Sequence, residues 1–514
     1  MKKYLFLLSG LVFLILISSC RNDFEFESST GNLEFSQDTV FLDTVFSTIG
    51  SSTRTFKVYN RSDDDIVIPT VGLRRGEQSR YRLSVDGAPG RVFEDVELLA
   101  KDSMFIQVET TIDINDFSGG TDFLYEDQID FDSGANLQTV ELVTLVQDAI
   151  FLFPELEDDG TIACVPIGED PDGNEICIEG FVLGTEELTF TNEKPYVIYG
   201  FAFVPNDAVM TVDPGARLHF HNNSGIIVTD NASIQVNGAL STTEDLENQV
   251  IFEGDRLEPV YSDVAGQWST IWLTAGSKNN IFNYTTIKNS SVGLLVDSSN
   301  PDSNGATLQI NNSQIYNCSN NGILATTGDI DAENLVIGNT GQSSFVGRFG
   351  GSYNFNNSTF ANYWNSSFRE DPVVLLSNTI PNATEFSADL TEANFTNCII
   401  YGNRDLEIAL LDDETSAFNF RFSKSLLRMN DRFDELSEIP AYDFSNASIY
   451  DSIIFNQDPL FKNVNFNEYL IDNTSPANGL ADPATATSND INGTDRGSSP
   501  DAGAYESTNL SEED

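Results

Sequence analysis

The chain has 514 residues, and its 26 Lys and Arg against 79 Asp and Glu give a formal net charge of −53. So acidic a chain lacks the basic surface that nucleic-acid binding requires, and an anionic lipid surface would repel it. Hydrophobic residues make up 40%, which excludes a disordered acidic tail, and five Cys exclude a disulfide-rich scaffold. The length predicts several domains or a repeat array.

The N-terminus has the features of a lipoprotein leader. Two lysines precede an apolar run over residues 4–17, which is shorter than the roughly 20 residues of a membrane-spanning helix. The run ends in Ile17-Ser18-Ser19-Cys20, which resembles a lipobox, so we expect residues 1–19 to be a signal peptide and Cys20 to be acylated. Residues 20–30 are expected to form an acidic tether. The acidic residues directly after Cys20 resemble the signal that sends lipoproteins to the outer face of some Gram-negative outer membranes. A tether that is only solvated and carries no such signal is an equal alternative.

Residues 31–150 are predicted to form a β-sandwich. Short segments rich in Val, Ile, Thr, Phe and Tyr are separated by turn sequences such as Asp86-Gly87. Between Thr53 and Tyr59 two sets of residues alternate with a period of two, which is typical of a half-buried strand. The stretch resembles the Ig-like domains that commonly precede larger modules in bacterial surface lipoproteins.

Residues 151–185 are expected to be a connector that contains a stapled hairpin. Cys164 and Cys177 flank a loop rich in Pro, Gly and acidic residues, and in an exported protein this spacing predicts a local disulfide. The loop lacks the spaced oxygen ligands and closing Glu of an EF-hand, so a hairpin is preferred to a calcium site. Cys318 and Cys398 are expected to be free thiols that face the core.

From residue 186 onward the sequence predicts a solenoid. Gly, Asn, Ser and Thr become frequent, and short apolar segments recur about every 20 residues. Stacked coils bury what a single strand cannot, and Asn at the bends suits left-handed turns and can form side-chain ladders. The residues expected to point inward are Leu218, Phe220, Ile234, Val236, Ile271, Leu273, Ile287, Leu294 and Val296.

Residues 186–506 resemble the right-handed parallel β-helices of the pectate-lyase-like type. Residues 207–220, with Pro-Gly between two predicted strands, are similar to an opening coil of that family. Ser475-Pro476-Ala477 and Ala502-Gly503-Ala504-Tyr505 resemble its terminal coil and cap. The predicted fold class is therefore all-β, a right-handed parallel β-helix solenoid with an N-terminal Ig-like β-sandwich, and residues 507–514 are expected to be a disordered acidic tail.

Two groups of side chains are candidates for ligand binding. Arg217, His219 and His221 alternate along a predicted strand and so share one face. An exposed polar row is preferred to a metal site there, because no third ligand is evident and an arginine would oppose a cation. Aromatic residues gather between positions 345 and 368, where core packing is preferred to a sugar-stacking groove. The candidate stacking residues are Tyr353, Tyr363 and Trp364.

Two functions fit the sequence. The preferred one is a lipid-anchored, non-catalytic module on the cell surface that binds a polysaccharide or a surface protein. The alternative is a carbohydrate-active enzyme, either a polysaccharide lyase or a glycoside hydrolase, which needs carboxylates across one groove or cations that offset a uronate. Cations are sparse after residue 186, and the only cluster is Arg421, Lys424, Arg428 and Arg432. No catalytic residue is identifiable, no cofactor is predicted, and a calcium ion is left open.

Overall fold

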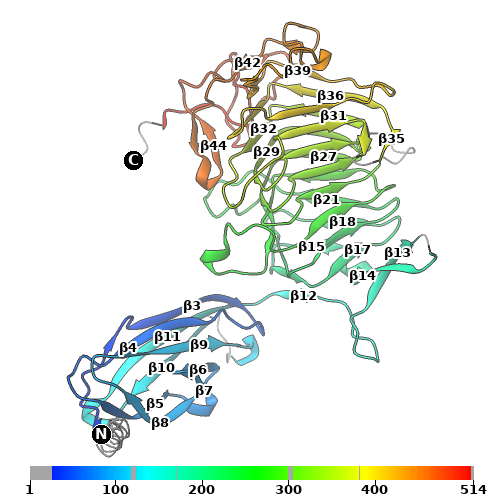
Figure 1. Cartoon of the computed structure of the whole chain (residues 1–514). Coiled ribbons are helices and arrows are strands. Elements are labelled where there is room, and N and C mark those ends of the chain that lie inside the picture. The colour runs from blue at the N-terminus through cyan, green and yellow to red at the C-terminus, as the bar shows by residue number, and fades with distance from the viewer. Residues whose placement is uncertain (1–25, 117–122, 171, 299–304, 381–382, 511–514) are drawn as a thin grey trace, which may run out of the picture. The chain divides into compact units, whose positions relative to one another are not determined.

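The computed structural model describes residues 26–116, 123–170, 172–298, 305–380 and 383–510. The chain divides into two compact units, Met1–Asp148 and Ala149–Asp514, and both are built of strands (Figure 1). Within the described ranges, no helix is long and apolar enough to cross a membrane. The predicted signal peptide and Cys20 lie outside the described residues.

The first unit is an Ig-like sandwich of two sheets, which confirms this part of the predicted fold class. A six-stranded sheet has the order β1-β5-β10-β11-β3 with β8 beside β5, and a five-stranded sheet has the order β2-β4-β9-β6-β7. Alternate residues point into the core, so Phe56 and Val58 are buried while Thr55 is exposed. The strands are β1 (Glu27–Ser28), β2 (Glu34–Phe35), β3 (Thr39–Phe46), β4 (Arg54–Tyr59), β5 (Ile66–Leu73), β6 (Tyr81–Val85), β7 (Ala88–Gly90), β8 (Val92–Leu98), β9 (Ser103–Thr110), β10 (Leu124–Phe131) and β11 (Gln138–Gln147).

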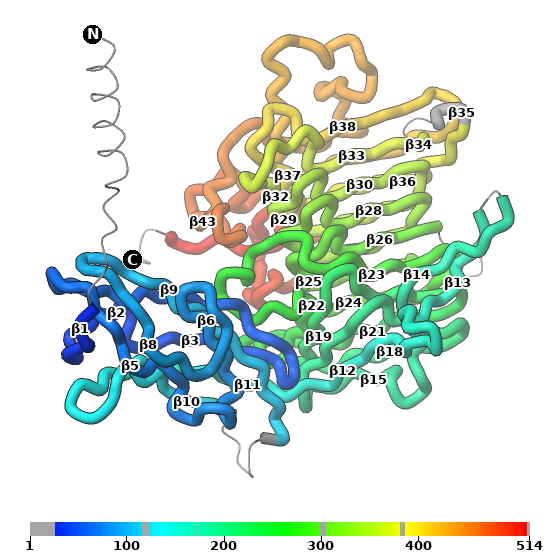
Figure 2. Tube along the Cα trace, turned by 60° about the horizontal axis from the view of Figure 1, so that its bottom comes forward, coloured from blue at the N-terminus to red at the C-terminus, as the bar shows by residue number. Residues whose placement is uncertain are grey.

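The second unit is a parallel β-helix whose successive coils contribute strands to three faces (Figures 1 and 2). Face A consists of β15 (Thr189–Phe190), β18 (Val209–Val212), β21 (Ser233–Asn237), β24 (Asn280–Asn283), the first halves of β27 (Leu308–Cys318) and β29 (Asp329–Thr340), β31 (Gly351–Asn356), β36 (Leu390–Thr396), β39 (Arg421–Ser423) and β41 (Tyr450–Asp451). Face B consists of β12 (Ile150–Leu152), β16 (Tyr196–Ile198), β19 (Arg217–Phe220), β22 (Val250–Gly254), β25 (Thr285–Lys288), the second halves of β27 and β29, β32 (Thr359–Asn362), β37 (Ile399–Gly402), β40 (Leu426–Leu427) and β42 (Ile454–Phe455).

Face C is a separate sheet that stacks one strand per coil. It consists of β14 (Glu175–Val182), β17 (Phe201–Val204), β20 (Gly225–Val228), β23 (Thr270–Leu273), β26 (Leu294–Val296), β28 (Ile323–Thr326), β30 (Phe345–Arg348), β33 (Val374–Ser377) and β38 (Ile408–Leu411). Strand β13 (Cys164–Glu169) pairs with β14 as an antiparallel hairpin at one end of this sheet. Two further hairpins, β34 (Thr379–Ile380) with β35 (Ala383–Ser387) and β43 (Phe461–Asn463) with β44 (Glu468–Ile471), lie outside the three faces.

The core and the bends follow the predicted pattern. All nine residues predicted to point inward are fully buried, which confirms the assignment of strand faces. Asn312, Asn334 and Asn397 stand between faces A and B in the left-handed region, with φ between 50° and 55°. Their side chains form ladders between coils: Asn334 Nδ2 donates to Asn312 Oδ1 at 2.9 Å, and Asn397 Nδ2 donates to Asn356 Oδ1 at 3.0 Å. Each such bond satisfies an amide at a tight bend.

The solenoid begins earlier than the sequence predicts. Strand β12 pairs with β16, and β14 pairs with β17, so residues 150–152 and 180–182 belong to the first coil rather than to a connector. The coil period is not visible there because the β13–β14 hairpin interrupts it. Of the connector predicted over residues 151–185, only the β13–β14 hairpin stands apart from the first coil.

Residues 461–510 form a segment that we call the clasp, and it does not cap the solenoid as a terminal coil would. It lies along face B, where the ring of Tyr469 rests on the backbone of Gly338 and Arg496 donates to Asn334 Oδ1 at 2.9 Å. The physical reason is that face B carries outward-facing apolar side chains that need cover. These are Val336, Ala361, Ile399, Tyr401 and Leu426. Leu510, in the expected tail, is held by the clasp as well, since its amide donates to Asp472 Oδ2 at 3.1 Å.

Candidate functional site

The predicted row of Arg217, His219 and His221 is not an exposed polar row. The Arg217 guanidinium donates to the carbonyls of Gln249 at 2.6 Å and Leu246 at 2.8 Å, and so ties down the loop that precedes β22. His219 is buried, with Nδ1 3.2 Å from the Gly254 carbonyl oxygen, and burial lowers its pKa. His219 is therefore closed to a ligand on the surface, and the partly buried Arg217 guanidinium is bonded to backbone carbonyls.

His221 is the exposed member of the row. Its Nδ1 lies 2.7 Å from Asp255 Oδ2, and its ring stacks on Tyr199 with centroids 4.4 Å apart. The hydrogen bond with Asp255 raises the pKa of His221. Across the part of the chain that the structure describes, no three His, Cys, Asp or Glu side chains gather as a metal site would require. Each histidine therefore has its own contacts within the protein, and the two do not share a ligand site among the described residues.

The candidate stacking aromatics are engaged within the protein. Tyr353 is fully buried, its hydroxyl donates to the Gly350 carbonyl at 2.8 Å, and its ring centroid lies 5.1 Å from that of Phe345. The sugar-stacking hypothesis is wrong for Tyr353, because alternation along β31 turns its side chain into the core. Tyr363 packs against Phe461 of the clasp, and Trp364 is buried and donates from Nε1 to Ser367 Oγ at 2.9 Å.

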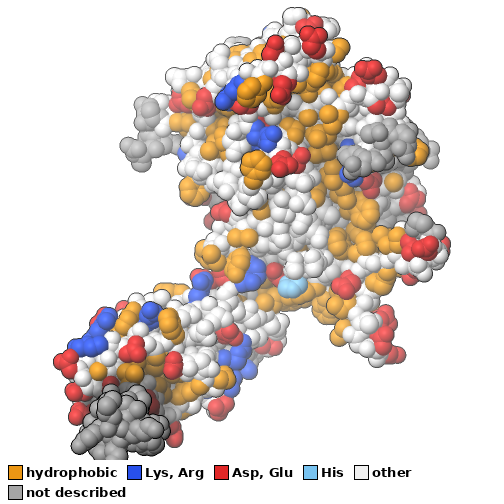
Figure 3. Space-filling view, viewed as in Figure 1, with side chains coloured by type: hydrophobic (Ala, Val, Ile, Leu, Met, Phe, Trp, Pro, Cys, Tyr) orange, Lys and Arg blue, Asp and Glu red, His pale blue; other side chains and the backbone are white. Residues whose placement is uncertain are grey.

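An open polar groove of about 480 Å³ crosses face A. Alternation along β29 points Asp331 and Glu333 outward while Ile330 and Ala332 face the core. Register then stacks Asn354 of β31 and Asn394 of β36 in line with Asp331. Thr485 of the clasp forms one wall. In Figure 3, uncharged polar side chains and backbone, drawn white, cover much of the visible side of the solenoid between hydrophobic and charged patches.

Amide side chains of the groove hold two carboxylates, that of Asp331 in the groove and that of the neighbouring Glu392. Asn354 Nδ2 donates to Asp331 Oδ1 at 3.2 Å and to Glu392 Oε1 at 3.0 Å. The two carboxylate oxygens are therefore at most about 6 Å apart, and so no farther apart than the roughly 5–9.5 Å that separate the carboxyl groups of glycoside hydrolases. Asn394 Nδ2 donates to Glu392 Oε2 at 3.1 Å and to Asn354 Oδ1 at 2.8 Å, and so continues the ladder.

A third carboxyl group, that of Asp329, lies near those of Asp331 and Glu392. Burial raises its pKa, and the charges of Asp331 and Glu392 raise it further, against an opposing hydrogen bond from Ser352. Ser352 Oγ also donates to Glu392 Oε1 at 3.2 Å, which links the two acids. A raised pKa brings a carboxyl group closer to the range in which it can serve as a general acid.

The sequence did not reveal this site. Asp329, Asp331 and Glu333 look like the outward half of an ordinary amphipathic strand, and Glu392 stands two coils later along face A. In a chain with 79 acidic residues, such neighbours are expected by chance. The usable signal is the recurrence of Asn at equivalent outward positions, because amide ladders hold acidic side chains in fixed places.

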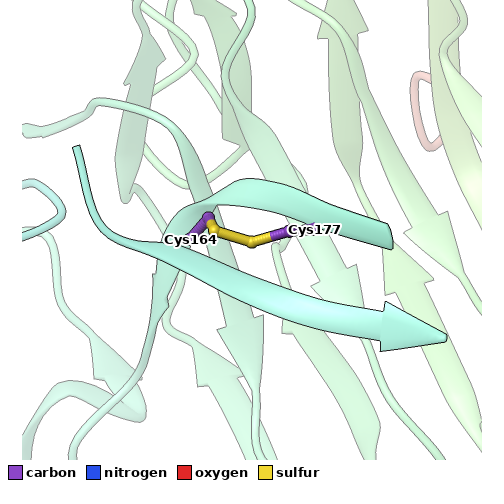
Figure 4. Close-up of a disulfide and its surroundings, with 2 residues drawn as sticks. All are labelled: Cys164 and Cys177. Carbon is purple, nitrogen blue, oxygen red and sulfur yellow. A yellow bond between two sulfur atoms is a disulfide. The ribbon is translucent and has the colours of Figure 1, made fainter. Parts of the chain in front are cut away.

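The paired cysteines lie in the hairpin beside face C. Cys164 of β13 and Cys177 of β14 form a disulfide across the two strands, with Cα atoms 5.7 Å apart (Figure 4). Cys318 and Cys398 are free and buried, as predicted, and burial raises the pKa of both thiols to about 12. The disulfide joins the two strands of the β13–β14 hairpin, and the two free cysteines pack as small side chains in the core.

No family model and no curated protein matches this chain. Among solved structures, the catalytic unit of a GH87 α-1,3-glucanase from Streptomyces thermodiastaticus shares 9% identity over 72% of this chain and 67% of its own, with a TM-score of 0.24. A PapD-like domain of human CEP192 shares 11% identity over 26% of this chain and 96% of its own, with a TM-score of 0.16. Similarities as distant as these do not assign an activity to this chain.

Proposed function

We propose that this protein binds a neutral glycan along the groove of face A. The observation that carries the proposal is the amide ladder of Asn354 and Asn394, which lines the groove together with Asp331 and ties the partly exposed Glu392 to it. Carboxylate oxygens accept hydrogen bonds from sugar hydroxyls, and side-chain amides both accept and donate such bonds. Among the described residues that line the groove there is no Lys or Arg, so a polyuronate would meet negative charge without compensation.

We further propose that the protein acts from the cell envelope. The basic, apolar leader and Ile17-Ser18-Ser19-Cys20 support an acylated Cys20, and several acyl chains would anchor the protein stably. The acidic residues that follow support placement on the outer face of a Gram-negative outer membrane. There the solenoid would meet polysaccharides outside the cell, consistent with its resemblance to pectate-lyase-like β-helices.

A second candidate function is glycoside hydrolysis at the same groove. It is favoured by the raised pKa of Asp329 beside Asp331 and Glu392. In this proposal Asp329 would protonate the glycosidic oxygen, and Glu392 would attack the sugar or activate water. Binding without hydrolysis remains our first proposal, because all three groups also have structural partners in the ladder.

The test combines a binding assay with a turnover assay on the purified chain. Neutral α- and β-glucans, galactans and mannans are titrated by calorimetry, and new reducing ends are measured in parallel. We expect Glu392→Gln to weaken glycan binding about tenfold, since one charged acceptor is lost. Glu414→Gln is the matched control, because Glu414 is exposed in a turn outside the groove.

Three outcomes separate the candidates. Binding that Glu392→Gln weakens, without new reducing ends, supports a binding module. Turnover that Asp329→Asn abolishes while binding persists supports a hydrolase. If no neutral glycan binds, or if Glu392→Gln and Glu414→Gln behave alike, the groove is not the site.

A further inference from the structure

Face C carries an apolar ladder on its outer surface. Trp272 lies between Ile271 and Leu273, which are both fully buried in the core, so its side chain points away from the core. Register places other apolar residues in the same outward column. They are Val182, Phe203, Ile227, Leu295 and Leu324. A parallel sheet covered on both faces is rich in such residues, so this ladder has the composition of a covered surface.

The disulfide-bonded hairpin turns one end of this ladder into a groove. Val165, Pro166 and Ile167 of β13 form a wall, and Phe203, Ile227 and Trp272 contribute to the floor of a space of about 540 Å³. Ile167 is 42% exposed and Val182 is 53% exposed. The Cys164–Cys177 bond joins the two strands of this wall (Figure 4). We call this space the hairpin groove.

The hairpin groove is largely apolar, and the one charged side chain among its described lining residues is acidic. Asp297 lies at the edge, where its Oδ2 accepts a hydrogen bond from Trp272 Nε1 at 2.7 Å. Beyond the groove, the same hairpin carries the exposed carboxylates of Glu169 and Glu175 near its turn. Among the described residues that line the groove, none is Lys or Arg. A second copy of this chain, at a net charge of −53, is repelled from such an edge.

We infer that the hairpin groove binds an extended segment of a partner protein that carries Lys or Arg beside large apolar side chains. An apolar side chain of the segment fills the space over Trp272, and its cations meet the acidic edge. Strand β13 stands at the end of the face C sheet and pairs only with β14 among the described strands. Its outer edge can therefore take an added strand, which is a common way for sheets to bind extended peptides.

The test uses the purified chain with its disulfide intact and three fluorescent nine-residue peptides. One alternates Lys with Leu, one replaces every Lys by Glu, and one replaces every Leu by Ser. Anisotropy measures binding of each. We expect Val182→Lys to weaken the Lys-Leu peptide about tenfold, because it places a cation in the groove. The matched control is Ile176→Lys, which adds the same charge to the same hairpin at a position that is 43% exposed and does not line the groove.

Tryptophan fluorescence gives a second readout. Trp268 and Trp364 are buried, whereas Trp272 is partly exposed, so the neutral quencher acrylamide reports mainly on Trp272. The Lys-Leu peptide should protect Trp272, and the Lys-Ser peptide should not. The inference is overturned if the two lysine variants weaken binding equally, if the glutamate peptide binds as well, or if a neutral glycan rather than a peptide protects Trp272. It is also overturned if the chain self-associates through this face in sedimentation and Val182→Lys abolishes that association.

Discussion

Ile287→Asp provides the strictest test of how the solenoid holds together. Ile287 is fully buried in β25, between Phe252 on one coil and Ile315 on the next. Loss of the buried side chain costs about 2–5 kcal/mol in comparable truncations. An unpaired polar group in its place adds about 1–3 kcal/mol. We therefore expect a loss of about 3–8 kcal/mol, a large part of the 5–15 kcal/mol that stabilises a typical domain.

Urea unfolding followed by tryptophan fluorescence measures this loss, because Trp268 lies in the same core cluster. The matched control is Val209→Asp, which makes a similar change from a β-branched residue in β18 at a position that is 50% exposed. We expect that control to lose less than about 1 kcal/mol. Equal midpoints for the two variants would refute the assignment of inward and outward faces on which the fold description depends.

Three further predictions concern other parts of the chain. Cys20→Ala should leave the protein unprocessed or soluble in cell fractionation, and a processed, membrane-bound mutant would disprove acylation at Cys20. The two histidines should titrate apart in NMR, with His221 above its ordinary pKa and His219 below it. Because the folded-state pKa of His221 is raised, its pairing with Asp255 should stabilise the fold fully below about pH 6.5 and be lost as pH rises through the folded value, an effect that His221→Gln should remove. Tyr469→Ala should cost about 3–5 kcal/mol locally and expose the clasp to limited proteolysis, whereas undiminished resistance would show that Tyr469 does not hold it.

The parts of the fold that repeat along the chain could be predicted, and the parts that depend on side-by-side coils could not. Ile234, Val236 and the bend asparagines carry a local pattern, so their roles follow from period and turn chemistry. Tyr353 could not be placed from its neighbours alone, since a tyrosine in a strand suits either a core or a groove. Asp331 and Glu392 meet only because face A brings separate coils into register. The outer cover of face B was missed because no local signal marks which outward residues another segment will cover.

The clasp sets the order in which this chain can be completed. Its Arg496 bonds to Asn334, and its Gly493 lies against Leu240, which is more than 200 residues earlier in the sequence. Most coils need only their immediate neighbours, so their contacts are local and quick to form. The clasp closes loops that span half the chain, and such long-range closure slows folding. A chain that is synthesised from its N-terminus must therefore leave the apolar side chains of face B uncovered until residues 461–510 have been made.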